Sequence, residues 1–564
     1  MPILVQFVCS REDGNQMSVT VFTARSVVTL DSAVSQANAV AVQDGRVLHT
    51  GMLEQVLADL DGLDITIDNQ FAESVIVPGF IEAHCHIVRE GSLSRYPWVG
   101  SYPRRQVDGS VQPGCPTVEA IIERLHVAHA EMKDQSESLI AVGFDMSMVG
   151  SQTLTLEMLD SVSETRPIWV MQSNGHVGHA NSAMLARAGV DNSATDEGVH
   201  RDENGNITGE IRELALAMFL GVHVNLDAGG ESAIWDGGHL ARQAGCTMVT
   251  DLANIATKKS IEGFANVVNH PGFPTRVRYA PLATFMSLRL SPDEIGNLLV
   301  DLEQFNSEKF AMGPLKFISD GSIQGRTARM NWPGYCCGSP NGLWLGNPEE
   351  LYKLMLPFHK AGYQLAMHTN GDEAIEAGVD IYRRLLEAHP RFDHRHRLEH
   401  VQMATDAMFR KIKTLGICVN LFANHLYFWG DTHRHDTMGP AKARHLDAVG
   451  TAVRMNIPHS IHSDAPVTPL APLFTMWCAV NRVTSTGHVL GEAERISALD
   501  ALKAMTIGSA YLLHCDDEYG SIEVGKFADF AVLDADPCAV DPMEIKDISV
   551  LATVLGGVVH SNAQ

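Results

Sequence analysis

Two histidines separated by a single residue, His84 and His86, end the first long apolar segment of the sequence. Side chains two residues apart leave the same face of an extended strand, so both imidazoles can bind one metal ion. Alone, the pair is a weak signal, because two core or surface histidines give the same pattern. Its meaning depends on whether other segments bring further ligands to the same place.

Later apolar segments also end in residues that can bind a metal. These residues are Lys316, His368, His400 and Asp464. This set of imidazoles, one carboxylate and a lysine that can be chemically converted could bind one or two divalent ions, most simply Zn²⁺. Water would then fill the open coordination position. We therefore predict a metal site in which these residues join His84 and His86.

Several of these residues have a second interpretation. Lys316 could form an ordinary ion pair with Asp320, which lies on the same strand face. Asp464 could cap the turn that precedes Pro466. We interpret His462 and Asp251 as structural residues.

The chain predicts an α/β fold, a TIM (β/α)8 barrel, because apolar strand-like segments alternate with helical stretches. A closed barrel collects the C-terminal ends of its strands around one axis, which is where the six residues above would meet. The segments that we interpret as barrel strands are 74–87, 246–253, 275–282, 314–321, 364–370, 396–402, 418–425 and 459–465.

Both ends of the chain are rich in strand signals, including a tight hairpin turn at Asp44-Gly45. We predict a small β-sandwich made of residues 18–75 together with 515–562, and a barrel domain over 76–514. The distance between the first two barrel strands is too long for one helix, so residues of about 90–230 are predicted to be an insertion. Residues 1–17 are predicted to be a disordered extension.

The composition limits the partners of the chain. It has 564 residues, with 42 Lys and Arg against 67 Asp and Glu, and a formal net charge of -25. This charge disfavours nucleic acid and anionic membranes and favours a neutral small-molecule substrate. The sequence has neither a signal-peptide pattern nor a long apolar run, and its 10 Cys form no CxxC pair. We therefore expect a cytoplasmic protein. A homo-oligomer is compatible with the sequence.

Five short segments together resemble the amidohydrolase superfamily, in particular its family-3 branch, which includes N-substituted formamide deformylases. They are 78–86 (PGFIEAHCH), 313–322 (GPLKFISDGS), 368–372 (HTNGD), 396–400 (HRLEH) and 463–466 (SDAP). The resemblance extends from about residue 18 to residue 560. It implies that His84 and His86 bind the more buried α metal and that His368 and His400 bind the β metal. It also implies that a carboxylated Lys316 bridges the two ions, and that Asp464 contacts the α metal and transfers the proton.

Substrate contacts are predicted in two further segments. His176 lies in a segment, NGHVGHAN, that resembles the family's glycine-histidine segment and could approach the substrate from above. His425 could donate a hydrogen bond to the substrate carbonyl, while Tyr427 and Trp429 build an apolar wall. The alternative is that His176 fixes a loop and that the aromatic residues pack a helix.

The predicted function is hydrolysis of a C–N bond in a small amide-like substrate, such as an N-substituted amide or formamide, by metal-activated hydroxide. A second hypothesis is a mononuclear hydrolytic deaminase of a heterocycle, which would leave Lys316 unmodified and release ammonia. A third is a catalytically dead barrel scaffold, although a scaffold has no reason to retain six metal-binding residues.

Overall fold

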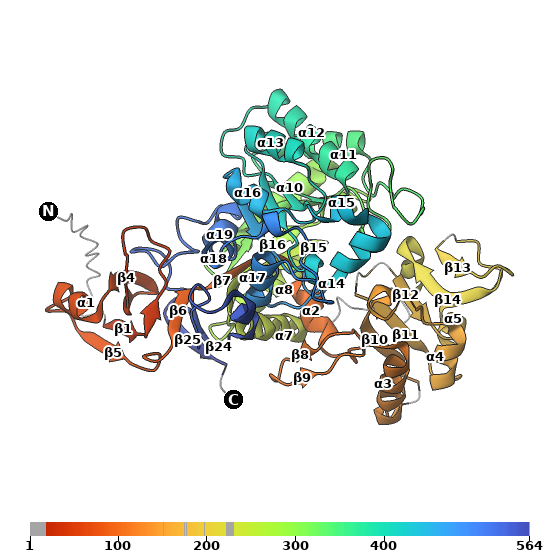
Figure 1. Ribbon diagram of the computed structural model, residues 1–564, viewed down its shortest axis with the longest axis horizontal. Helices are drawn as coiled ribbons and strands as arrows, with labels where there is room; N and C mark the ends of the chain where they lie inside the picture. The colour runs from red at the N-terminus through yellow and green to blue at the C-terminus, as the bar shows by residue number, and fades with distance from the viewer. Residues whose placement is uncertain are drawn as a thin grey trace.

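The computed structural model describes residues 18–134, 136–150, 152–173, 175, 177–196, 198–220 and 230–562. The predicted N-terminal extension and His176 lie outside the described residues. The fold is a mixed α/β structure, as predicted from the sequence. Figure 1 shows a central body of strands and helices with smaller β-rich parts on either side of it.

Two parallel sheets form the centre of the molecule. The first has the order β17-β16-β15-β7, and the second has the order β18-β19-β20-β21-β22. An isolated parallel bridge between Leu282 and Lys316 links the sheets on one side, and the backbone N–H of His86 donates to the carbonyl of Ala465 on the other, at 2.7 Å. The strands are β7 (Phe80–Cys85), β15 (Cys246–Asn254), β16 (Arg276–Pro281), β17 (Phe310–Met312), β18 (Leu315–Ile318), β19 (Leu365–Thr369), β20 (Arg397–His400), β21 (Cys418–Leu421) and β22 (His459–Ile461).

Helices between these strands cover the sheets and enclose the largest hydrophobic core. Local signals define their ends. Ser291 caps the N-terminus of α10 and forms a capping box with Glu294. Gly416 caps the C-terminus of α13, where its left-handed backbone suits a residue without a Cβ. These helices are α7 (Gly230–Gln243), α8 (Lys258–Val268), α9 (Ala283–Met286), α10 (Pro292–Leu302), α11 (Pro348–Lys360), α12 (Asp372–Ala388), α13 (Asp406–Leu415), α14 (His425–Thr432), α15 (Gly439–Ala443), α16 (Val449–Arg454), α17 (Pro472–Asn481), α18 (Ala498–Ala504) and α19 (Ile507–Leu512).

The two chain ends supply two further sheets, ordered β4-β3-β1-β5 and β2-β6-β23-β24-β25. Residues from both, such as Phe22 and Phe530, share one buried cluster. The predicted hairpin turn is present: Asp44 and Gly45 both have positive φ and join β3 to β4. The elements are β1 (Val19–Thr23), β2 (Ser26–Val27), β3 (Ala39–Gln43), β4 (Arg46–Gly51), α1 (Leu53–Asp59), β5 (Ile65–Asp68), β6 (Val75–Pro78), β23 (Phe530–Leu533), β24 (Val550–Leu555) and β25 (Val558–Ser561).

The segment between β7 and α7 forms its own sheet, ordered β10-β11-β12-β14-β13, with two hydrophobic clusters of its own. In Figure 1 this sheet lies on the opposite side of the central body from β1 and β4. The elements are α2 (Ile87–Leu93), β8 (Arg104–Arg105), β9 (Val111–Gln112), α3 (Val118–Glu131), β10 (Leu139–Phe144), α4 (Leu156–Val162), β11 (Ile168–Gln172), β12 (Val177–Ala180), α5 (Ser182–Ala188), β13 (Val199–Arg201), β14 (Ile207–Arg212) and α6 (Ala217–Leu220).

Within the described part of the chain, every helix is too short or too polar to cross a lipid bilayer.

A buried ion pair ties the central sheets to the C-terminal strands. The Arg276 guanidinium donates to both oxygens of Asp529, at 2.7 and 3.0 Å, and one of these oxygens also accepts the backbone N–H of Gly556 at 2.7 Å. Asp529→Ala leaves the guanidinium without its main counter-charge, so we expect the free energy of unfolding to fall by about 3 kcal/mol or more. Urea unfolding followed by circular dichroism measures the change.

Glu308 is the control, because it contacts the same guanidinium at 2.8 Å but has a side chain that is 58% exposed. An exposed partner contributes about 1 kcal/mol or less. Equal effects of Asp529→Ala and Glu308→Ala would contradict the proposed importance of the buried pair.

Candidate metal centre

Three of the predicted ligands converge on one point at the ends of β7 and β22. Asp464 Oδ1 lies 3.3 Å from His84 Nε2 and 3.2 Å from His86 Nε2. The ligand atoms of the three residues all lie within 4.8 Å of one another, a spacing that a metal ion could fill.

The outer nitrogen of each of these imidazoles is already engaged. His84 Nδ1 lies 2.6 Å from Glu399 Oε2, and His86 Nδ1 lies 2.7 Å from the Leu252 carbonyl. Both oxygens can only accept, so each Nδ1 carries the proton and each Nε2 presents a lone pair. Three atoms that accept but do not donate therefore face one another, an arrangement that a cation would stabilise.

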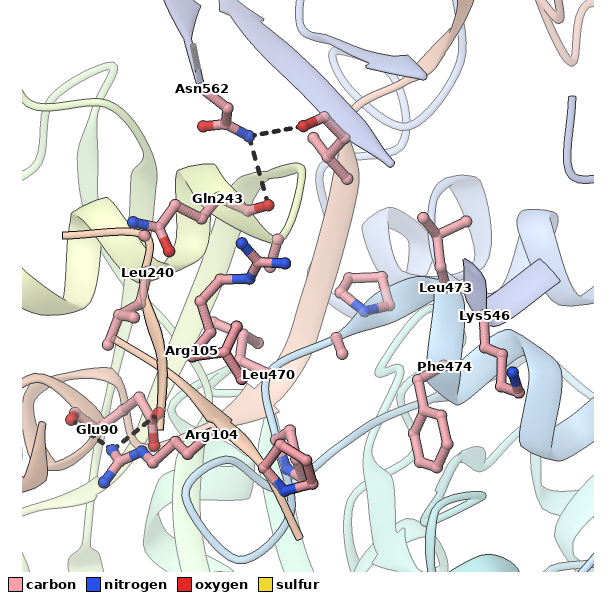
Figure 2. A pocket seen from close by; sticks show the side chains of 18 of the residues that line it. Glu90, Arg104, Arg105, Leu240, Gln243, Leu470, Leu473, Phe474, Lys546 and Asn562 are labelled. Atoms are coloured by element: carbon pink, nitrogen blue, oxygen red, sulfur yellow. Dashed lines mark hydrogen bonds and ion pairs between the residues drawn. The ribbon is translucent and has the colours of Figure 1, made fainter. Parts of the chain in front are cut away.

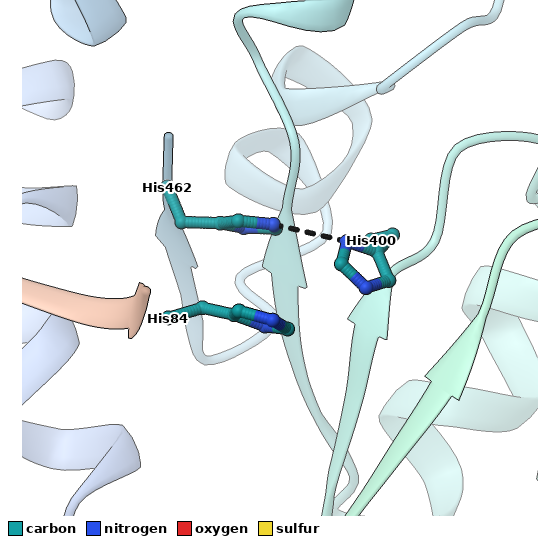
Figure 3. Close-up of side chains that lie close together, drawn as sticks. All are labelled: His84, His400 and His462. Carbon is teal, nitrogen blue, oxygen red and sulfur yellow. Dashed lines mark hydrogen bonds between the residues drawn. The ribbon is translucent and has the colours of Figure 1, made fainter. Parts of the chain in front are cut away.

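His400 lies beside this group on β20. Its ring centroid is 4.7 Å from that of His84 and 4.5 Å from that of His368, which lies on β19. Figure 3 shows His84 and His462 with parallel rings and His400 facing both. His84, His400 and His462 form a second group whose nitrogens lie close enough to hold an ion.

The His368 ring also lies at this centre, but its Nε2 has protein neighbours. This atom is 3.0 Å from Asn370 Nδ2 and 3.2 Å from the Gly321 carbonyl oxygen. Burial lowers the pKa of His368 to about 3, with Lys316 contributing in the same direction. A neutral imidazole is the form that binds a metal, so the ring is in the protonation state that the prediction requires.

The amine of Lys316 is buried, with only 2% of the residue exposed, and its Nζ has no hydrogen-bond partner among the described residues. Burial lowers the pKa of this amine to about 8, although the carboxylates of Glu399 and Asp464 oppose the shift. The alternative ion pair with Asp320 is absent, because that carboxylate instead accepts backbone N–H groups of residues 329, 370 and 371. A neutral lysine is the form that reacts as a nucleophile.

Two of the site residues have unusual backbone conformations. His400 has φ of 70° and Asp464 has φ of 54°, both in the left-handed region that non-glycine residues rarely adopt. Such strain persists where the surrounding structure enforces it, often at functional sites. Here it explains how Glu399 and His400, consecutive residues that would point to opposite faces of a regular strand, both contact the centre.

His425, a predicted substrate contact, is buried at the start of α14. Its Nδ1 lies 2.9 Å from His433 Nε2, and its ring is 4.4 Å from that of Trp429 and 4.9 Å from that of Phe422. Trp429 Nε1 donates to Asp145 of the β10 end at 2.8 Å. Trp429 therefore lies beside His425 and connects the central body to the segment that follows β7.

Tyr427 lies at the edge of the aromatic cluster of Phe422, Phe428 and Trp429. Its ring packs against Phe474 and Trp477 of α17, which agrees with the helix-packing interpretation of this residue. Phe422 was not predicted as a site residue, but its ring packs against the His462 ring, with centroids 5.0 Å apart.

Sequence reasoning also missed Glu399 and Asn420, which contact the site from behind. A signal for Glu399 was available, because Arg397 and Glu399 place two opposite charges on one face of the short strand RLEH. Asn420 gave no comparable signal, because polar residues are common near strand ends whether or not they belong to a functional site.

A separate cavity of about 710 Å³ lies between the β8–β9 hairpin, α7 and α17. Figure 2 shows its side chains, including the ion pair between Glu90 and Arg104 at 3.0 Å. None of the six predicted metal-binding residues lines it, although Pro466 and Thr468 place one wall just beyond Asp464. The histidine cluster and this cavity are therefore distinct features.

Comparison with known proteins gives matches over most of the chain. The family model described as "Amidohydrolase family" matches residues 73–560. The N-substituted formamide deformylase of Arthrobacter pascens is 25% identical, over 97% of this chain and 98% of its own length. The protein LONG AFTER FAR-RED 3 of Arabidopsis thaliana is 26% identical, over 95% of this chain and 90% of its own length.

Among solved structures, an uncharacterized metal-dependent hydrolase from Pyrococcus horikoshii OT3 superposes with a TM-score of 0.71 at 19% identity. The match covers 93% of this chain and 99% of that one. At this level of identity the likeness concerns the fold.

Proposed function

This chain belongs to the amidohydrolase family, and we propose that it uses one or two divalent metal ions, most simply Zn²⁺, to hydrolyse a C–N bond in a small amide-like substrate. The observation that carries the proposal is the convergence of His84 Nε2, His86 Nε2 and Asp464 Oδ1. Their outer partners leave only lone pairs facing inward, and a divalent cation is the simplest group that satisfies all three.

We propose further that the two central sheets close into one eight-stranded barrel, in which β17 and β18, separated only by Gly313 and Pro314, count as one interrupted strand, and that the terminal sheets form a sandwich. The bridge at Leu282 and Lys316, together with the bond from His86 to Ala465, supports closure on both sides. In such a barrel the strand ends form the active site, which is where the six residues lie.

In this proposal His84, His86 and Asp464 hold the first ion, and His368 and His400 hold the second. Lys316 would contribute to the centre as a carbamate, which forms when its neutral amine adds to CO2 and loses a proton. Among the described residues Lys316 Nζ has no hydrogen-bond partner, which supports this role, because an unmodified buried amine would lack the partners that its donors require. The carbamate supplies two oxygens and a negative charge.

When bound, the divalent ions lower the pKa of water and polarise a carbonyl group. Asp464 accepts the proton of the attacking water and returns it to the leaving nitrogen, so amide and water become carboxylic acid and amine. The carboxylate is suited to this role because it is ionised: although burial opposes ionisation, the neighbouring His84 holds the pKa of Asp464 well below its usual range.

His425, Phe422 and Trp429 form the side of the site that would receive the substituent on the substrate nitrogen. Burial, reinforced by His433, holds the pKa of His425 well below its usual range, so the ring is neutral and can donate to a carbonyl oxygen. The aromatic neighbours favour apolar or aromatic N-substituents. The relative from Arthrobacter pascens, an N-substituted formamide deformylase, supports the same choice.

A substrate screen tests the proposed function. The metal-loaded protein is incubated with formamides, anilides, lactams, ureas and aminated heterocycles, and both carboxylate and ammonia are detected. We expect carboxylate and amine from an N-substituted amide. Release of ammonia from a heterocycle alone would instead support a mononuclear deaminase, and no turnover of any class by fully loaded protein would support a scaffold.

The first variant prediction concerns His84. His84→Ala removes one of the three proposed ligands of the first ion, so we expect metal content and hydrolysis to be lost together. Elemental analysis after gel filtration measures the content. His126→Ala, an exposed histidine on α3, is the matched control and should retain the wild-type content. Full occupancy with normal turnover in His84→Ala would reject the assignment.

Asp464→Asn is expected to separate metal binding from proton transfer. The amide keeps the shape of the side chain and one coordinating oxygen but cannot accept a proton as a carboxylate does. We predict a fall in kcat of about 10²-fold or more with much of the metal retained. Steady-state kinetics beside elemental analysis would show this, and a kcat near that of the wild type would exclude Asp464 as the proton carrier.

Lys316→Ala tests the bridge. Wild type loaded with metal in the presence of bicarbonate should bind about two ions, and the variant about one or fewer, because the bridging oxygens are gone. Short carboxylic acids should partly restore activity by supplying those oxygens. Lys353→Ala, on the exposed face of α11, is the control. If the wild type binds one ion and its structure shows an unmodified lysine at position 316, the binuclear hypothesis is wrong and the mononuclear one takes its place.

A further inference from the structure

We infer that one carboxylate oxygen, Glu399 Oε2, orients metal-binding histidines on two different strands, His84 directly and His400 through Asn420 and His462. Asn420 and His462 are then positioning residues and not ligands. The inference rests on the metal centre of the proposed function, and it adds the groups that make its imidazoles ready to bind.

The relay starts from a carboxylate that can only accept hydrogen bonds. Glu399 is fully buried, and its Oε1 lies 2.5 Å from Arg397 Nε. Arg397 is itself anchored, because its Nη2 donates to the Ala83 carbonyl at 2.9 Å. The guanidinium compensates the buried negative charge, so the carboxylate stays ionised.

The ionised carboxylate fixes the orientation of Asn420. The Asn420 Nδ2 group donates to Glu399 Oε2 at 3.0 Å, and the opposite amide orientation would place two acceptors in contact. Asn420 Oδ1 must therefore point the other way. There it accepts the hydroxyl of Ser460 at 2.8 Å and lies 3.0 Å from His462 Nδ1.

The amide oxygen then fixes the tautomer of His462. Because Asn420 Oδ1 is an acceptor, His462 Nδ1 must carry the proton, and a neutral imidazole has its lone pair on Nε2. His462 Nε2 lies 3.1 Å from His400 Nδ1, so His400 Nδ1 donates this hydrogen bond. The lone pair of His400 is left on Nε2, the nitrogen available to a metal.

A second branch leaves the same oxygen. His84 Nδ1 lies 2.6 Å from Glu399 Oε2 and donates to it, which leaves the His84 lone pair on Nε2. The His84 and His462 rings are stacked, as Figure 3 shows. Their centroids are 4.7 Å apart and their interplanar angle is 13°. Glu399 thus orients ligands from β7 and β20 together.

The direction of these hydrogen bonds makes His462 a positioning residue, although its distance from His84 and His400 would also allow it to be a metal ligand. His462 belongs to a group that could hold an ion with His84 and His400. In the relay, however, its Nε2 lone pair accepts the proton of His400 Nδ1, so it is not free to bind a metal. An ion is therefore expected at the His400 Nε2 side and not between these three rings.

Neutron diffraction on deuterated crystals of the metal-loaded full chain tests the relay directly, because it locates deuterons on imidazole nitrogens. We expect deuterons on Nδ1 of His84, His400 and His462 and none on their Nε2 atoms. A deuteron on Nε2 of His462, or a metal ion bound to that atom, would overturn the inference.

Metal affinity, measured by competition with a chelator, provides the functional readout. Asn420→Leu breaks the relay between Glu399 and His462 without touching a ligand, so we expect about 10-fold to 100-fold weaker binding of the ion held by His400. Ser460→Ala removes a second donor to the same amide oxygen but leaves the relay intact, and should bind as the wild type does. Unchanged affinity in a folded Asn420→Leu variant would contradict the inference.

These readouts separate the relay from the proposed reaction. If the loaded protein hydrolyses no amide, the reaction is wrong, yet the deuteron positions still decide the relay. If Asn420→Leu fails to fold, as its circular dichroism would show, the neutron map of the wild type remains decisive. If the wild type binds one ion only, a deuteron on His400 Nε2 would reject the relay, and a bare Nε2 would support it.

Discussion

The buried negative charge of Glu399 is the constraint on which the centre of this protein depends. A carboxylate removed from water must be compensated by a cation and by hydrogen-bond donors, or it takes up a proton. Arg397 supplies the cation, and His84 and Asn420 supply donors to the other oxygen. Because these partners come from three strands, satisfying one charge aligns β7, β20 and β21 at the same depth and turns their polar ends toward each other.

Bringing the polar side chains together at the strand ends requires unfavourable backbone conformations at two residues. His400 and Asp464 occupy left-handed conformations, which cost of the order of 1 kcal/mol or more for residues with a Cβ. In a regular strand the side chains of Glu399 and His400 would point to opposite faces of the sheet. The left-handed conformation at His400 instead lets both side chains reach the same centre. The site is therefore formed at the expense of local backbone stability.

The sequence was most informative where a residue type is chemically unusual for its position. Histidines, a lysine and an aspartate at the ends of apolar segments predicted the residues that the structure brings together, since few structural roles require that set at those places. It was least informative about Asn420, Phe422 and His433, because ordinary polar and aromatic residues gain their roles only from three-dimensional neighbours. Tyr427, predicted to share an apolar wall with His425, lies about half a helical turn farther along α14, and its ring packs against α17.

Lys316 unites these observations, because its environment is contradictory for an unmodified amine. Burial favours the neutral form, whereas the nearby carboxylates of Glu399 and Asp464 favour the charged one, and the balance leaves a pKa of about 8. At this pKa about a tenth of the amine is uncharged near pH 7, and its Nζ has no hydrogen-bond partner among the described residues. Charged, it would oppose any metal ion held by the surrounding histidines. Converted to a carbamate, it would contribute negative charge and oxygen ligands at the point where His84, His368 and His400 present nitrogens, so the same burial that destabilises the ammonium prepares the residue to complete the centre.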